Sequence, residues 1–169
     1  MIPTIVGGIL ATAGGFGAKF YNDFRERKSL RTALSAEVRS FLGMLDREKI
    51  EELFRKTLRK IGEMNRLPLF PVSFRGTYST VFCGSASKLG FLDPCLLNKL
   101  VDYYYQIQTL LELSEIFSKN LDDISARDVQ NDPKEIEEQT ELLREMLTCL
   151  TEVRKVAIEL VDQLDPAPN

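Results

Sequence analysis

The sequence predicts an all-α protein in which an N-terminal transmembrane helix is followed by an antiparallel helical bundle. No charged side chain precedes Lys19. After this segment, apolar residues recur at spacings of three and four, the period of an amphipathic helix, and no stretch alternates as a strand does. Asp-Pro pairs at 93–94 and 132–133 are typical helix starts. The predicted units are an anchor helix at 1–21, a bundle at 22–165 and a tail at 166–169.

The N-terminal segment is long enough to cross a bilayer, because about twenty helical residues span roughly 30 Å. No Lys or Arg precedes the apolar run, which argues against a secretory signal peptide. The flanking basic residues all lie on its C-terminal side: Lys19, Arg25, Arg27, Lys28 and Arg31. The positive-inside rule then predicts a single-pass protein of the inner membrane, with the N-terminus outside and the bundle in the cytoplasm. The five basic side chains are expected to contact lipid headgroups.

Small residues form a stripe within this segment. Gly7, Ala11 and Gly15 recur every four residues, and so do Gly14 and Ala18. Such spacing allows two membrane helices to approach closely, which predicts packing against a second copy or a partner helix. The competing interpretation is that glycine is simply common in membrane helices.

The first helices of the bundle follow from the apolar spacing. One run covers 30–45 and a second covers 50–61. The apolar stripe changes face at 43–49, which indicates either a kink or a new helix with Asp46 as its N-cap. Two prolines within 66–74 then predict a connection rather than a continuous helix.

Four features divide the rest of the bundle. A short helical stretch from Tyr78 ends at Gly90, a candidate C-terminal cap. The Asp93-Pro94 pair starts the next helix, and the polar stretch 120–131 is predicted to be a loop. A final helix then runs from Asp132-Pro133 to Asp165-Pro166.

The composition argues against a catalytic site and against a metal site. The chain has no histidine, which removes the commonest general base and a frequent metal ligand. Cys83, Cys95 and Cys149 match no zinc spacing and are expected to be reduced, mostly buried thiols. No phosphate-binding loop is present. We therefore expect no enzyme, no cofactor and no metal site.

Charge is distributed unevenly along the chain. Residues 19–66 carry a net charge of +5 and residues 67–169 a net charge of −8. The basic half suits an anionic membrane surface, whereas the acidic half disfavours nucleic acid. Oppositely charged helix faces packed together would produce the same pattern. The basic group of Lys56, Arg59, Lys60 and Arg66 leaves the same two interpretations open.

Three consecutive tyrosines, Tyr103, Tyr104 and Tyr105, form the most unusual local run. Neighbouring helix positions point in different directions, so at least one ring is expected to be exposed while Tyr104 packs inward. Tyr103 and Tyr105 are the predicted partner contacts, since exposed aromatic rings are enriched at protein interfaces. An amphipathic ring that tolerates partial exposure is the competing interpretation.

The chain resembles small uncharacterised bacterial single-pass membrane-anchored helical proteins. The resemblance is carried by the glycine-rich apolar start, the basic junction, and the stretches Tyr78-Ser79-Thr80 and Ser85-Ala86-Ser87-Lys88-Leu89-Gly90-Phe91-Leu92 ahead of the tyrosine-bearing helix. It implies membrane association and a helical cytoplasmic domain, and it brings no catalytic residues.

The expected function is that of a membrane-tethered, non-enzymatic interaction or regulatory module. We expect lipid membrane as one partner, an unidentified protein as another, and a homo-oligomer. The alternative is a pore-forming or membrane-disrupting effector controlled by its cytoplasmic helical domain, to which the small-residue stripe would contribute. The third hypothesis is a soluble enzyme with a buried N-terminal helix.

Overall fold

The computed structural model describes residues 3–67 and 78–165, with the side chains described from residue 21 onward. Within these ranges the protein is all-α, as predicted, and contains no strand. The helices are α1 (Pro3–Glu48), α2 (Ile50–Met64), α3 (Thr80–Gly84), the 3-10 helix η1 (Ala86–Phe91), α4 (Pro94–Arg127) and α5 (Pro133–Leu164).

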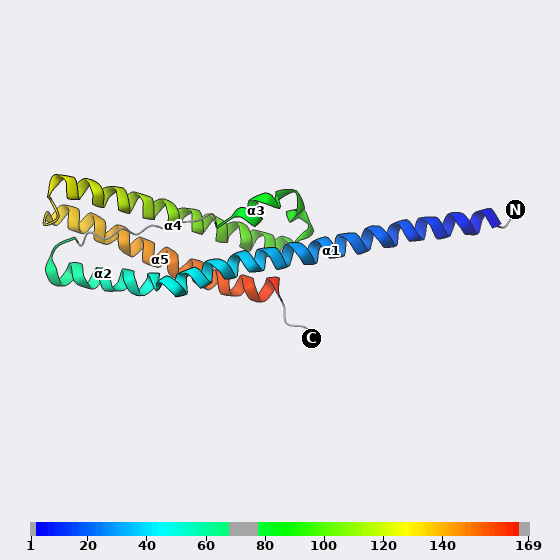
Figure 1. Ribbon diagram of the computed structural model, residues 1–169, viewed down its shortest axis with the longest axis horizontal. Helices are drawn as coiled ribbons and strands as arrows, with labels where there is room; N and C mark the ends of the chain where they lie inside the picture. Colours follow the sequence, from blue (N-terminus) through cyan, green and yellow to red (C-terminus); the bar gives the residue numbers. More distant parts are fainter. Residues whose placement is uncertain (1–2, 68–77, 166–169) are drawn as a thin grey trace.

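The long helices form an antiparallel bundle (Figure 1). α4 and α5 are an antiparallel pair, and α1 followed by α2 runs along α5 in the opposite direction. α5 packs against α4, α1 and α2, which makes it the central helix of the bundle. The short helices α3 and η1 lie against α1 at one end.

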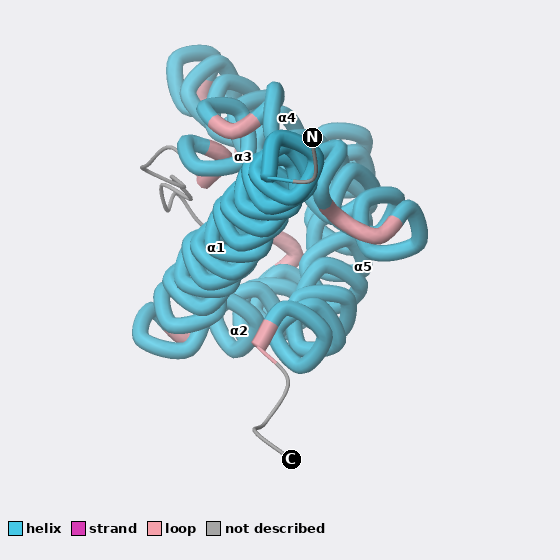
Figure 2. The backbone as a smooth tube through the Cα atoms, turned by 90° about the vertical axis from the view of Figure 1, so that its right-hand side faces the viewer, coloured by secondary structure: helices cyan, strands magenta, loops and turns pink. Residues whose placement is uncertain are grey.

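Helix α1 continues beyond the bundle as a single projecting helix (Figure 1). In the end-on view of Figure 2 this part points toward the viewer, in front of the other helices. Among the residues whose side chains are described, the first from α1 to enter the core is Leu30, followed by Leu34 and Val38. One continuous helix therefore supplies both a projecting arm and a wall of the core.

The break between α1 and α2 is a kink at Lys49, which adopts the left-handed conformation with φ of 49°. The backbone N–H of Leu53 still donates to the carbonyl of Lys49 at 2.9 Å, so the helical path resumes at once. Asp46 is not the N-cap considered from the sequence. It lies inside α1, and its carboxylate accepts from Arg154 of α5 at 2.5 Å.

Both predicted Asp-Pro helix starts are confirmed. The carboxylate of Asp93 accepts from the N–H of Cys95 at 2.9 Å and of Leu96 at 3.4 Å. Asp132 accepts from the N–H of Lys134 at 2.9 Å. In each case the following proline occupies the first helical turn, where its missing N–H costs nothing.

The prediction of a loop at 120–131 is mostly wrong, because α4 continues to Arg127. Leu121 and Ile124 are buried and continue the apolar face of α4 through a polar stretch. The helix ends at Asp128, which takes the left-handed conformation. Gly90 likewise lies within η1 rather than capping a longer helix. Packing against α5 outweighs the polar composition here.

The part of the chain that the structure describes contains no helix that meets the length and hydropathy needed to cross a membrane. The anchor predicted at 1–21 is therefore not supported as a transmembrane helix. Its physical weakness is composition, since residues 3–20 include five glycines and two threonines, which add little hydropathy. Residues 1–2, the tail 166–169 and most of the predicted connection at 66–74 lie outside the described residues.

Substitution of Leu160 tests the central role of α5. Its side chain is 0% exposed, so Leu160→Ala should lower the free energy of unfolding by about 2–5 kcal/mol. Ile158, two residues earlier, is 50% exposed, and Ile158→Ala should cost less than about 1 kcal/mol. Urea unfolding of both variants measures the difference, and equal losses would contradict the described packing of α5.

Candidate functional site

Aromatic and basic side chains gather where α1 leaves the bundle. Tyr21 and Phe24 are each 61% exposed on this part of the helix. Arg25, Arg27 and Lys28 follow and are also exposed. Glu26, which lies between them, is ion-paired with Lys88 of η1 at 3.8 Å. Aromatic rings next to Lys and Arg are the usual composition of a segment at a membrane–water interface. We call the five aromatic and basic residues the junction.

A pocket of about 650 Å³ opens beside the junction. One wall comes from α1, a second from the link between η1 and α4, and a third from the C-terminal end of α5. The lining residues are Phe24, Arg27, Lys28, Arg31, Thr32, Phe91, Leu92, Asp93, Pro94, Leu96, Leu164 and Asp165. Its wall thus combines aromatic and aliphatic surface with three basic side chains. We call it the junction pocket.

Arg31 is the fixed basic side chain of this pocket. Its Nη2 donates to the backbone carbonyl of Gln163 in the last turn of α5. Carbonyls at a helix C-terminus carry partial negative charge, so the guanidinium links α1 to the end of α5. The side chain is half-buried, unlike the neighbouring Arg27 and Lys28.

Both carboxylates that line the junction pocket already have partners. Asp93 caps α4 through its two backbone hydrogen bonds. Asp165 accepts from Arg39 at 3.2 Å. Within the described ranges, by contrast, the side chains of Arg27 and Lys28 have no hydrogen-bond or ion-pair partner. The pocket therefore presents cationic groups that the rest of the described structure does not neutralise.

The five predicted headgroup residues separate into three groups. Arg25, Arg27 and Lys28 are exposed at the junction, and Arg31 is half-buried against α5. The side chain of Lys19 lies outside the described ones. The sequence alone did not separate Arg25 from the others, although only Arg27, Lys28 and Arg31 line the pocket. The available signal was the spacing: Arg27 and Lys28 lie three and four residues after Phe24, and Arg31 lies four and three residues after them, on the same face of the helix.

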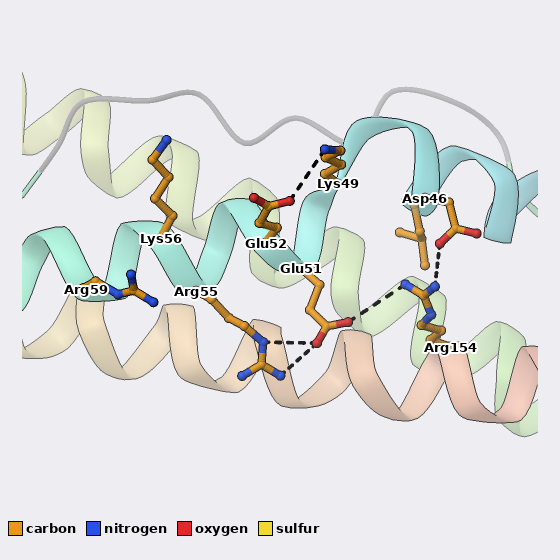
Figure 3. A pocket seen from close by; sticks show the side chains of 9 residues that line it. Asp46, Lys49, Glu51, Glu52, Arg55, Lys56, Arg59 and Arg154 are labelled. Atoms are coloured by element: carbon orange, nitrogen blue, oxygen red, sulfur yellow. Dashed lines mark hydrogen bonds and ion pairs between the residues drawn. The ribbon is translucent and has the colours of Figure 1, made fainter.

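A second hollow, of about 590 Å³, lies at the kink between α1 and α2 (Figure 3). Its charged side chains are largely paired. Arg154 contacts Asp46 at 2.5 Å and Glu51 at 3.9 Å, and Arg55 contacts Glu51 at 2.8 Å. Lys49 contacts Glu52 at 3.9 Å. Because these pairs are solvent-exposed, each contributes little to stability.

These ion pairs also show how the charged faces meet. The basic group of Lys56, Arg59, Lys60 and Arg66, in and just after α2, forms no ion pair with the acidic residues of α5 in the described contacts. The basic partner comes instead from α5, as Arg154, and its acidic partners come from α1 and α2. Arg66 donates to the side chain of Gln130. Ion pairs between oppositely charged helices therefore involve only single residues here. They do not explain why residues 19–66 carry a net charge of +5 and residues 67–169 a net charge of −8.

The tyrosine run divides differently from the sequence prediction. Tyr105 is 72% exposed, as expected of a partner contact, and Tyr104 is buried as predicted. Tyr103, the other predicted contact, is only 1% exposed, so its surface is not available to a partner. Its ring packs edge-on against Phe41 of α1 at 6.3 Å. Two consecutive rings of α4 are therefore buried, and each contacts a residue of α1.

Glu37 holds α3 to α1 and α4, a role that the sequence did not reveal. Its carboxylate accepts from the hydroxyl of Tyr104 at 2.5 Å. It also accepts from the backbone N–H of Val81 at 2.7 Å and of Phe82 at 3.3 Å. The ring of Phe82 stacks on Tyr104 at 4.3 Å. One half-buried carboxylate thus joins three segments far apart in sequence.

The same environment changes the acidity of two tyrosines. Burial raises the pKa of Tyr104 well above its usual value of 10.0, and the hydrogen bond to Glu37 raises it further. Burial, with the charge of Glu37, also raises the pKa of Tyr103. Both phenols therefore stay neutral in the folded protein at pH values where an exposed tyrosine ionises.

Other predicted features are resolved only in part. Cys83 and Cys95 are exposed and Cys149 is half-buried, so the expectation of mostly buried thiols is wrong. All three are free, and burial raises the pKa of Cys149. The described residues contain no cluster of three or more His, Cys, Asp or Glu that could hold a metal ion. Gly7, Ala11, Gly14, Gly15 and Ala18 lie within α1, where only the backbone is described, so their packing stays a prediction.

Alkaline unfolding tests the contact between Tyr104 and Glu37. A tyrosine with a raised folded-state pKa contributes stability that is present below about pH 10 and is lost as pH rises toward the folded value. Tyr104→Phe should therefore make the fall of unfolding free energy above pH 10 less steep, by up to about 1.4 kcal/mol per pH unit. Denaturant unfolding at a series of pH values, with pH 7 as the reference, measures the slope. Identical slopes for wild type and variant would refute this account.

Comparisons with family models, with curated proteins and with solved structures found no match to this chain. The resemblance to small bacterial single-pass proteins therefore stays a prediction. A proposal about function therefore depends on the geometry of the junction and of the bundle.

Proposed function

We propose that the protein is a membrane-tethered, non-enzymatic interaction module. The projecting part of α1 enters the lipid bilayer, and the bundle is held at the inner face of the cytoplasmic membrane. There the bundle binds a protein partner, and the chain associates with further copies of itself.

The observation that carries this proposal is the position of the junction. A segment without a charged residue before Lys19 projects as a helix from the end of the bundle. The exposed rings of Tyr21 and Phe24 and three exposed basic side chains follow directly on it. Apolar, aromatic and basic residues thus succeed one another along one helix in the order that a membrane boundary favours. A segment of modest hydropathy also gains affinity from nearby basic residues when the lipid is anionic.

A surface of α4 supports the partner-binding part of the proposal. Val101 and Tyr105 are both exposed and lie four residues apart, so they share one face of the helix. Exposed aromatic rings are enriched in protein interfaces. This face is the contact that we assign to the protein partner.

Flotation of the full-length chain with lipid vesicles tests the tether. Wild type should float with the vesicles. Ile9→Asp should remain with the soluble fraction, because a carboxylate at the centre of a membrane segment costs about 2.5–3.5 kcal/mol. Ile158→Asp makes the same chemical change on the exposed face of α5 and should float as wild type does.

Three outcomes would overturn this proposal. Failure of wild type to float, or equal flotation of wild type and Ile9→Asp, would remove the tether. Release of a dye trapped inside the vesicles would replace a passive tether with the membrane-disrupting alternative.

A further inference from the structure

We propose that the junction pocket binds the phosphate of an anionic phospholipid headgroup, with Arg27 and Lys28 as the phosphate ligands and Arg31 as a fixed cationic wall. This inference rests on the proposed function, because it assumes that the projecting part of α1 contacts lipid. It adds a selectivity for anionic lipid that a purely apolar tether would not have.

The first argument is the unneutralised charge of the pocket. Arg27 and Lys28 line it without a partner among the described residues, whereas Asp93 and Asp165 are held by the α4 backbone and by Arg39. A phosphate that enters the pocket therefore meets free donors and carboxylates that are already engaged. Arg and Lys are also the side chains that bind phosphate best, through charge-assisted hydrogen bonds.

The second argument is the mixed wall of the pocket. Phe24, Phe91 and Leu164 line it together with the basic residues. In a phospholipid at the membrane boundary, the phosphate is joined to the apolar acyl chains through one glycerol unit and its ester groups. A wall that joins cationic and apolar surface matches both parts, whereas an inorganic phosphate would use only the cationic part.

The third argument is the height of the pocket along α1. Arg27 lies seven residues beyond residue 20, which is roughly 10 Å along a helix axis. The headgroup layer on each side of a bilayer is roughly 5–8 Å thick. Because an arginine side chain is long and can extend along the helix, Arg27 reaches this layer when the segment before it lies in the hydrocarbon.

Arg25 supplies a matched control within the same turn of helix. It carries the same charge and is exposed, but it does not line the pocket. A diffuse attraction to an anionic surface would treat Arg25 and Arg27 alike, with a loss of about fivefold in affinity for either one. If a phosphate in the pocket accepts a hydrogen bond from Arg27, loss of Arg27 should lower the affinity for anionic vesicles by more than loss of Arg25.

The experiment measures partition of the full-length chain between buffer and vesicles of phosphatidylcholine, alone or mixed with phosphatidylglycerol. Wild type should prefer the anionic vesicles. Arg27→Gln should lower partition into anionic vesicles by roughly tenfold to a hundredfold, as expected for loss of a hydrogen bond to a charged group. Arg25→Gln should lower it about fivefold or less. Both variants should lower partition into the phosphatidylcholine vesicles by less than this, because the choline cation there already offsets the charge of the phosphate.

The outcomes separate this inference from the function on which it rests. Binding to neither vesicle overturns the tether itself. Equal binding of wild type to neutral and anionic vesicles leaves the tether standing and overturns the headgroup site, as do equal losses for Arg25→Gln and Arg27→Gln. Thermal stabilisation by inorganic phosphate alone, abolished by Arg27→Gln, would assign the pocket to a soluble anion and overturn the lipid assignment.

Discussion

Burial of α5 between α4 on one side and α1 with α2 on the other is the interaction on which the structure depends. Every long helix places its apolar face against α5, and the core residues of α5 recur at helical spacing along its whole length. No single helix of this kind is stable alone in water, because most helical stability in proteins comes from packing of the apolar face. The position of α1, and therefore the direction of its projecting arm, follows from this contact.

The junction shows how the bundle determines the surroundings of the arm. Arg31 donates to a carbonyl of the last turn of α5, and the start of α4 closes the pocket on another side. The basic residues of α1 are thereby held next to apolar groups from two other segments. A free peptide with the same sequence would carry the same charges without this arrangement. The bundle thus turns a basic stretch into a shaped site.

Parts of the fold followed from local chemistry. An aspartate before a proline predicts a helix start because the carboxylate accepts from the first free N–H groups, and both such starts are confirmed. The prediction of a loop at 120–131 was wrong because the structure there depends on tertiary contacts rather than on local chemistry. Leu121 and Ile124 are too few to mark a helix by themselves, and it is their burial against the bundle that extends α4. The carboxylate of Asp46 accepts from Arg154 of α5, a contact that no local sequence pattern predicts.

The sequence by itself determined the all-α class, the two Asp-Pro helix starts, and the order of apolar, aromatic and basic residues along the first helix, since each depends on neighbours within a few positions. Only the tertiary structure decided that Tyr103 is buried while Tyr105 is exposed, that Glu37 joins α1 to α3 and α4, and that three of the basic residues line a pocket. These contacts join side chains dozens of residues apart. Their geometry depends on how whole helices cross, and helical periodicity carries no information about that crossing.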